Sequence, residues 1–185
     1  MKKYLFLLLI IICSMSVHAQ IYIGMEGKLA INTDKQDYKS TILQEGYDLA
    51  GGGDFLIGYS FNNRINMSIS AGKLWFLWNM FVEEYTLSSV EGTIKWFFIK
   101  KRFPGFFIGG GAGYYSEYFY ADLPGIAEEL KRHQFDFFPC LGYLFDSNIT
   151  EGLYINAEVA YYNIFREKSI SHFTFNLGTY YFFGK

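Results

Sequence analysis

Large apolar and smaller polar side chains alternate along most of the chain after residue 20. The stretch 171–183 shows the pattern most fully. One set of alternate positions is apolar and consists of Phe173, Phe175, Leu177, Tyr181 and Phe183. The other set is smaller and more polar at first, with His172, Thr174, Asn176 and Gly178, and continues with Tyr180 and Phe182. Successive side chains of a β-strand point to opposite faces, so this stretch predicts a strand with one apolar face.

The same alternation predicts eight strands. We expect them over residues 21–32, 54–61, 65–72, 84–98, 105–120, 135–146, 153–162 and 172–183. Strands of roughly ten residues have the length that a tilted membrane strand needs. In a closed sheet the last strand must pair with the first, so we expect residues 172–183 to lie antiparallel to 21–32.

The segments between these strands predict turns and loops. Long loops are expected over 33–53 and over 122–132, with a helical turn at 126–130. Shorter turns are expected at Asn62-Asn63, at 100–104 and at 146–152, and the aromatic residues Trp75, Phe76, Trp78 and Phe81 are expected in a short loop. The alternation slips at 87–89, which suggests a bulge, and Pro139 lacks a ladder donor.

The composition of the polar face indicates which face looks outward. It consists largely of Gly, Ser, Asn and Ala with a charge every few positions, which suits a cramped interior better than a surface in water. The other face is nearly all Ile, Leu, Phe and Tyr, as lipid contact requires. We therefore favour a membrane barrel over a soluble barrel with an apolar interior, such as a lipocalin. Trp75 and Trp78 are candidates for an outer aromatic girdle, and Trp96 for a periplasmic one.

The first residues predict a secretory signal peptide. Lys2 and Lys3 precede an apolar run over 4–13, and Val17 and Ala19 are the small residues of a cleavage site. Residues 1–19 are therefore expected to be the signal peptide and residues 20–185 the barrel domain. A lipoprotein anchored at Cys13 is the alternative, but the bulky Ile12 precedes that cysteine where a small residue is needed.

Charge and cysteine content argue against nucleic-acid binding and against an internal disulfide. The chain has 16 basic and 18 acidic residues, and loss of Lys2 and Lys3 with the leader leaves 14 basic residues and a net charge of −4. That balance gives no sign of nucleic-acid binding. Cys140 is then the only cysteine, so no internal disulfide can form, and we expect its thiol to be buried.

The end of the chain carries a more specific pattern. Asn176, Gly178, Tyr181 and Phe183 form a polar-x-Gly-x-x-hydrophobic-x-aromatic motif, followed by Gly184 and Lys185. It resembles the C-terminal assembly signal of bacterial outer-membrane β-barrels, although in that family the aromatic residue ends the chain. With the leader and the strand pattern, the chain resembles the small OmpA/OmpX-type barrels. The resemblance implies an eight-stranded antiparallel up-and-down transmembrane barrel, a monomer in the outer membrane with both termini in the periplasm, which meets the barrel-assembly machinery during biogenesis.

Several charged residues fall on the inward face. They are Glu26, Lys28, Asp54, Glu91, Lys95, Asp136 and Glu158, with Arg166 as a further candidate. Charges in a narrow lumen must pair or stay wet. We expect an internal salt-bridge network that plugs the barrel, because eight strands enclose little more than their own side chains. A small proton or ion path is the alternative.

No catalytic, metal or cofactor site is expected. His172 with Ser169, Ser171 and Glu167 invites comparison with outer-membrane lipid A deacylases, but that family has His-x-Ser, whereas Ser171 and His172 are adjacent and point to opposite faces. His133 and His172 lack metal-ligand spacing. Gly109, Gly111 and Gly113 do not form a phosphate loop and are expected to clear space for facing aromatic side chains.

These observations favour a small outer-membrane protein with a structural or adhesion-like surface role, with its loops as the working part. Two alternatives remain: a lipid-modifying enzyme, and a narrow transporter of small or apolar solutes.

Overall fold

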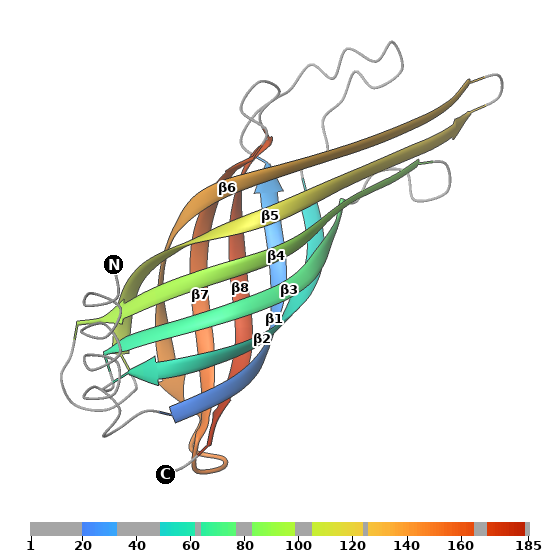
Figure 1. The fold of residues 1–185 in the computed structure, drawn as a ribbon. Coiled ribbons are helices and arrows are strands. Elements are labelled where there is room, and N and C mark those ends of the chain that lie inside the picture. Colours follow the sequence, from blue (N-terminus) through green and yellow to red (C-terminus); the bar gives the residue numbers. More distant parts are fainter. Residues whose placement is uncertain are drawn as a thin grey trace, which may run out of the picture.

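The chain forms a closed barrel of eight antiparallel strands arranged in sequence order. The computed structural model describes residues 20–32, 49–61, 64–76, 83–98, 105–123, 126–164 and 170–183. The strands are β1 (Gln20–Asn32), β2 (Leu49–Phe61), β3 (Ile65–Phe76), β4 (Glu83–Phe97), β5 (Gly105–Leu123), β6 (Ile126–Asp146), β7 (Leu153–Ile164) and β8 (Ile170–Phe182) (Figure 1). None of the described residues forms a helix long and apolar enough to cross a membrane.

Strand β8 closes the barrel against β1. The antiparallel ladder runs from Tyr22 opposite Phe182 to Asn32 opposite His172, and the backbone N–H of Phe183 donates to the carbonyl of Ile21 over 2.8 Å. This is the register expected from the sequence. The first and last described residues therefore lie at the same end of the barrel, which we call the terminal end; the opposite end is the distal end (Figure 1).

The two faces of the sheet are distributed as the alternation predicts. Large apolar side chains point outward and remain exposed: Leu177 and Phe55 are both 65% exposed and Phe137 is 66% exposed. Their neighbours along the chain, such as Asn176 and Asp136, point into the lumen and are each 4% exposed. A soluble barrel would bury its large apolar side chains, whereas this one presents them on the outside.

Inward glycines make room for aromatic rings. A Cβ atom at Gly111 would lie 2.4 Å from the Phe138 ring, and one at Gly58 would lie 2.2 Å from the Tyr22 ring. A real Cβ atom does not approach another atom so closely, so both positions require glycine. The expected role of Gly111 as a space for a facing aromatic side chain is thus confirmed.

The predicted loop over 122–132 and the helical turn at 126–130 are wrong. Strand β5 continues to Leu123 and β6 begins at Ile126, with Leu123 opposite Ile126 and Tyr120 opposite Glu129. The Ala, Glu and Leu residues of this stretch favour a helix locally, but cross-strand pairing overrides that preference. The two strands extend well beyond the rest of the distal rim as a long hairpin (Figure 1).

Three smaller expectations also need correction. The loop 33–53 ends earlier, because β2 begins at Leu49 and its glycines belong to the strand, where a Cβ atom at Gly52 would lie 2.0 Å from the Lys73 carbonyl oxygen. Trp75 and Phe76 belong to β3 rather than to a loop. No bulge occurs at 87–89, since the β3–β4 register is continuous there; the slip arises because the apolar Leu87 occupies a buried lumen position.

The turn at 146–152 is confirmed, with Gly152 at a φ of 86°. Other expectations fall outside the described residues: the leader and its cleavage site, the turns at Asn62-Asn63 and 100–104, and the positions of Trp78, Phe81 and Arg166.

Strands β6 and β7 separate partway along the barrel. Their ladder runs only from Asp146 opposite Tyr154 to Cys140 opposite Ala160, and it stops at Pro139. On the other side β6 remains paired with β5 from Ile126 to Leu144. Proline has no N–H to donate and in sheets occurs at strand edges. Within the described residues, β6 therefore has a ladder on one side only from Pro139 toward the distal end.

This separation predicts uneven amide exchange along β6. In residues 135–138 the amides that point toward β5 should be protected and the alternating amides should exchange faster, except that of Phe137, which donates to Asp136 Oδ1. All amides of 141–144 should be protected, because that part has neighbours on both sides. Hydrogen exchange followed by NMR on the barrel in lipid nanodiscs measures both segments in one sample. Uniform protection across 135–144 would show that the seam is paired in the membrane.

Candidate functional site

The seven predicted lumen charges all lie on the inward face. Their residues are 4–8% exposed: Glu26, Lys28, Asp54, Glu91, Lys95, Asp136 and Glu158. They come from five different strands, β1, β2, β4, β6 and β7. The barrel thus gathers in one interior charges that are far apart in the sequence.

Lys28 is the centre of the first cluster. Its Nζ lies 2.6 Å from Asp54 Oδ2 on the neighbouring β2 and 3.3 Å from Glu91 Oε2 on β4. The hydroxyl of Tyr162 on β7 donates to the same Glu91 oxygen over 3.3 Å. These contacts cross the lumen, because β1, β4 and β7 are not adjacent in the barrel.

Lys95 is the centre of the second cluster. Its Nζ lies 2.5 Å from Glu158 Oε2 and 3.9 Å from Glu26 Oε1, and it donates to the Tyr180 hydroxyl over 2.9 Å. The Tyr180 hydroxyl in turn donates to Glu26 Oε1. Asn156 Nδ2 also donates to Glu26, over 2.9 Å, so the cluster joins β4 to β1, β7 and β8 across the interior.

The two clusters account for six of the seven predicted charges. Asp136 on β6 accepts hydrogen bonds from Gln134 Nε2 over 3.2 Å and from the Phe137 N–H over 2.7 Å. The sequence did not single out Tyr162 and Tyr180 as members of the clusters. The alternation alone placed both tyrosines on the inward face, and that was the available signal.

Aromatic side chains cap the clusters toward the distal end. The Tyr162 ring stacks on Phe138 with centroids 4.6 Å apart and on His172 with centroids 5.0 Å apart. Lys28 Nζ lies 5.9 Å from the centroid of the Tyr162 ring. Packed rings and ion pairs from several strands thus meet in the interior of the barrel.

Of the four candidate catalytic residues, the described structure contains Ser171 and His172. His172 is 1% exposed inside the barrel, and the hydroxyl of Ser171 donates to Asn163 Oδ1 over 3.4 Å. Ser169 and Glu167 lie outside the described residues. In the parts of the chain that are described, no group of three or more His, Cys, Asp or Glu side chains could hold a metal ion. Cys140 is a free thiol, buried as expected.

The long hairpin carries an ion pair that the sequence reasoning missed. Arg132 Nε lies 2.5 Å from Glu117 Oε2, and Arg132 Nη2 donates to Glu117 Oε1 over 2.9 Å. The two residues are opposite each other on β5 and β6. Because Arg132 had been placed in a loop, the alternation could not pair it with Glu117.

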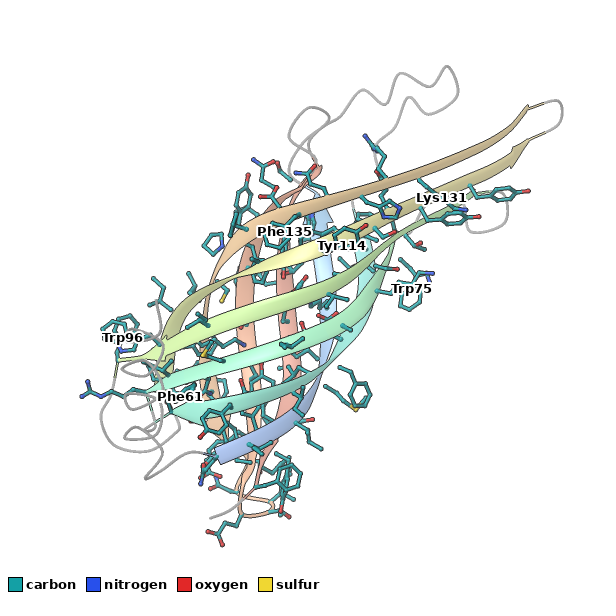
Figure 2. The ribbon with its side chains drawn as sticks, in the orientation of Figure 1. Phe61, Trp75, Trp96, Tyr114, Lys131 and Phe135 are labelled. Carbon is teal, nitrogen blue, oxygen red and sulfur yellow. The ribbon has the colours of Figure 1, made fainter. Side chains whose placement is uncertain are left out.

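The tryptophans of the predicted girdles lie toward opposite ends of the barrel (Figure 2). Trp96 lies at the terminal end, opposite Ile65, and Trp75 lies ten residues further along β3. Both are 47% exposed on the outside. Ten residues of a strand span about 33 Å, which at a tilt of roughly 40° corresponds to about 25 Å along the barrel axis, the height of a lipid-facing band.

The four residues of the terminal motif are divided between the two faces of β8. Asn176 points inward, where its Nδ2 donates to Glu158 Oε1 over 3.1 Å. A Cβ atom at Gly178 would lie 2.6 Å from the Glu26 side chain, so this position has no room for a larger residue. Tyr181 and Phe183 point outward and contact each other edge to face, with centroids 5.0 Å apart.

Comparison with known proteins places the fold. No family model and no curated protein matches the chain. Solved structures do match over nearly the whole barrel. Ail, the attachment invasion locus protein of Yersinia pestis, in complex with the heparin analogue sucrose octasulfate, has a TM-score of 0.56 at 17% identity, over 89% of this chain and 97% of that one.

Two further structures agree with this. Neisserial surface protein A has a TM-score of 0.61 at 13% identity, over 88% of this chain and 97% of that one. The N-terminal β-barrel domain of Pseudomonas aeruginosa OprF has a TM-score of 0.52 at 13% identity, over 90% of this chain and all of that one. The chain therefore has the fold of the small eight-stranded outer-membrane barrels.

Removal of the Lys95 amine should destabilise the barrel strongly. Lys95→Met leaves the buried carboxylates of Glu26 and Glu158 without their cation, at a cost of about 3–5 kcal/mol in the free energy of unfolding. Urea titration followed by heat-modifiable gel mobility measures the loss. Lys73→Met on the outer face is the control and should change stability by less than about 1 kcal/mol. Addition of Glu158→Gln to Lys95→Met should restore part of the loss; equal effects of both lysine substitutions would contradict the network.

Proposed function

We propose that the chain is an outer-membrane barrel, exported by the leader 1–19 and inserted with its terminal end toward the periplasm. Three observations support the proposal: the exposed apolar outer face, the two exposed tryptophans separated by about the height of a lipid-facing band, and the terminal aromatic motif. Lipid would cover the outer face, and the barrel-assembly machinery would read Tyr181 and Phe183.

We further propose that the barrel works through its surface rather than through a channel. The observation that carries this proposal is the pair of lysine clusters that tie β4 to β1, β7 and β8 across the lumen. An eight-stranded barrel leaves little space beyond its own side chains. Ion pairs between opposite walls occupy that space and hold the walls together.

The long β5–β6 hairpin is the proposed working surface. It extends beyond the distal rim and presents Tyr120 and Lys131 on its exposed face. Exposed tyrosines are typical of interaction surfaces. Ail, which has the same fold, was solved with a heparin analogue, and the analogy favours an adhesion-like contact at the cell surface.

A non-enzymatic role fits the position of His172. Its imidazole is enclosed by the barrel and stacks on Tyr162, so a substrate at the rim would not reach it. The separation of β6 from β7 at Pro139 favours one second candidate, lateral passage of a small apolar solute between the two strands. Uptake of an apolar probe into liposomes that contain the barrel would distinguish this candidate from a surface role.

The closed lumen predicts that the purified protein gives no steady conductance in a planar lipid bilayer. The combined variant Lys28→Ala, Glu91→Ala, Lys95→Ala and Glu158→Ala should conduct if it folds, because it shortens the side chains that fill the middle of the lumen. Reproducible open channels of porin size in the wild-type protein would overturn the plug. Heat-modifiable mobility confirms that both proteins are folded before the recording.

The terminal motif predicts a defect in assembly rather than in export. Tyr181→Ala with Phe183→Ala should lower the amount of folded barrel in the outer membrane, with unassembled chain degraded in the periplasm, because the two rings face outward at the end of the closing strand. The control is Phe173→Ala with Phe175→Ala, which removes two outward rings from the same strand outside the motif. A folded band at wild-type intensity in the first variant would mean that the motif is a chance match.

A further inference from the structure

The edge of β6 that faces away from β5 is open along the long hairpin. Strand β6 pairs with β5 from Ile126 to Leu144, whereas its ladder with β7 covers only Cys140 to Asp146. In an antiparallel sheet the N–H and C=O groups of alternate residues point away from the neighbouring strand. Among the described residues, the outward groups of 126–134 therefore have no strand beside them, and the hairpin carries them beyond the distal rim (Figure 1).

An open edge of this kind accepts an extended strand. Its unpaired backbone groups form a template that another strand completes by main-chain hydrogen bonds. The stretch 126–134 belongs to β6 throughout, and nine residues of strand span about 30 Å. Charged residues on an edge normally deter pairing with other chains, so the order of charges along this edge decides which strand fits it.

The order of charges in the sequence is self-complementary. Two identical strands can pair antiparallel about a centre at Leu130, so that Glu128 of each copy lies opposite Arg132 of the other and Glu129 opposite Lys131. Because each pair occurs twice, four cross-strand pairs join an acidic residue to a basic one. Opposite charges across an antiparallel ladder stabilise it, whereas like charges destabilise it. A second copy of this chain is therefore the strand that fits the edge.

The geometry of the ladder restricts the register of such a pair. A residue whose hydrogen-bonding groups point outward must meet a residue of the partner that points outward too, so the centre of symmetry falls on a residue and not between two. A centre at Glu129 places two glutamates opposite each other, and a centre at Lys131 places two lysines opposite each other. The centre at Leu130 avoids both of these like-charge contacts.

The same charges disfavour a pair of neighbours in one membrane. Two barrels inserted in the same direction and related by a two-fold axis would bring their β6 strands together in parallel, with each residue beside its own counterpart. Glu129 would then lie beside Glu129, and Lys131 beside Lys131. An antiparallel pair instead places the terminal ends of the two barrels on opposite sides of the contact, which is the arrangement of barrels in two facing membranes.

Contacts within the hairpin restrain its basic residues before any partner binds. Lys131 Nζ lies 5.4 Å from the centroid of the Tyr118 ring. Arg132 Nη2 donates to Glu117 Oε1 over 2.9 Å, and the Arg132 side chain remains 23% exposed while that of Glu117 is buried. A long side chain that is already restrained loses less conformational entropy when it forms a further pair.

We propose that the open edge of the hairpin pairs antiparallel with the same edge of a second copy in a facing membrane, over residues 126–134 with Leu130 at the centre. The proposal rests on the membrane location and surface role proposed above, and it identifies the partner of that surface as this chain itself. A nine-residue strand pair is a small interface, so a single pair binds weakly. Many copies on two facing surfaces bind together and hold them in contact.

Liposomes that carry the full-length barrel test the proposal. Two populations are labelled with different dyes, and fluorescence cross-correlation measures the fraction of particles that carry both. Wild-type populations should associate. Glu129→Lys in both populations should weaken association about tenfold, because two opposite-charge pairs become like-charge pairs, and Lys131→Glu should have the same effect. Unchanged association in both single variants would overturn the proposal.

Recombining the charges distinguishes pairing from a general effect of net charge. Liposomes with Glu129→Lys mixed with liposomes with Lys131→Glu should associate, because acidic and basic residues again lie opposite each other. The double variant Glu129→Lys with Lys131→Glu should associate with itself for the same reason. Glu151→Lys, in the exposed turn at the terminal end, is the matched control and should leave association unchanged. Failure of the mixture to recover, or an equal loss with Glu151→Lys, would overturn the proposal.

Insertion is scored separately from association, by heat-modifiable mobility of the liposome-bound protein. If the charge reversals misassemble, Glu129→Gln and Lys131→Gln carry the same comparison, and unchanged association in both would overturn the proposal. A wild-type protein that fails to insert would refute the membrane location. Inserted barrels whose liposomes stay separate would refute only the pairing. Energy transfer between labelled barrels within one liposome, without association of liposomes, would show a pair in one membrane and overturn the facing arrangement.

Discussion

A strand surrounded by hydrocarbon must have every backbone N–H and C=O paired, because each unpaired group costs several kcal/mol there. Closure of β8 on β1 meets this constraint for these two strands, and the register of the pair determines which of their residues face inward. Strand β6 departs from the constraint in the described structure, because from Pro139 toward the distal end it is paired with β5 only. Moving the β1–β8 register by one residue would turn the apolar face of β8 into the lumen and bring Asn176 and His172 into lipid. The arrangement of charges and rings in the interior therefore depends on this closing ladder.

The side chains in the lumen must meet two separate needs, which are pairing of charges and filling of space. Its charges must find partners, since a buried charge without one is costly, and its volume must be filled by side chains from eight strands. Lys28 and Lys95 satisfy both needs, because each reaches across the interior to carboxylates on non-adjacent strands. Glycines such as Gly58 and Gly111 leave space for the rings packed around them. The interior therefore resembles the core of a soluble protein in its packing, but it contains charged side chains.

The distal half departs from the regular barrel. Beyond Pro139, β6 leaves β7 and continues with β5 into the long hairpin. The hairpin reaches past the distal rim, and ion pairs between non-adjacent strands occupy the interior (Figure 1).

The alternation of residue types was enough to predict eight strands, their inward and outward faces and the seven lumen charges, because a period of two depends only on local backbone geometry. The β1–β8 register needed a further premise, that the sheet closes on itself. Glu26 and Lys95 could be placed inside, but their partners could not be chosen. Which carboxylate meets which amine depends on how the sheet curls and how far its strands are staggered.

The wrong predictions have the same cause, which is that the sequence does not show which strands become neighbours. Residues 126–130 favour a helix by themselves, and only pairing with β5 makes them a strand. The glycines that follow Leu49 suggest a loop when the sequence is considered alone. In the structure this stretch is a strand because it pairs with β1 on one side and with β3 on the other. The sequence by itself determined the strands and their faces. The tertiary structure decided the ion pairs and the length of the hairpin, because both depend on neighbours that are distant along the chain.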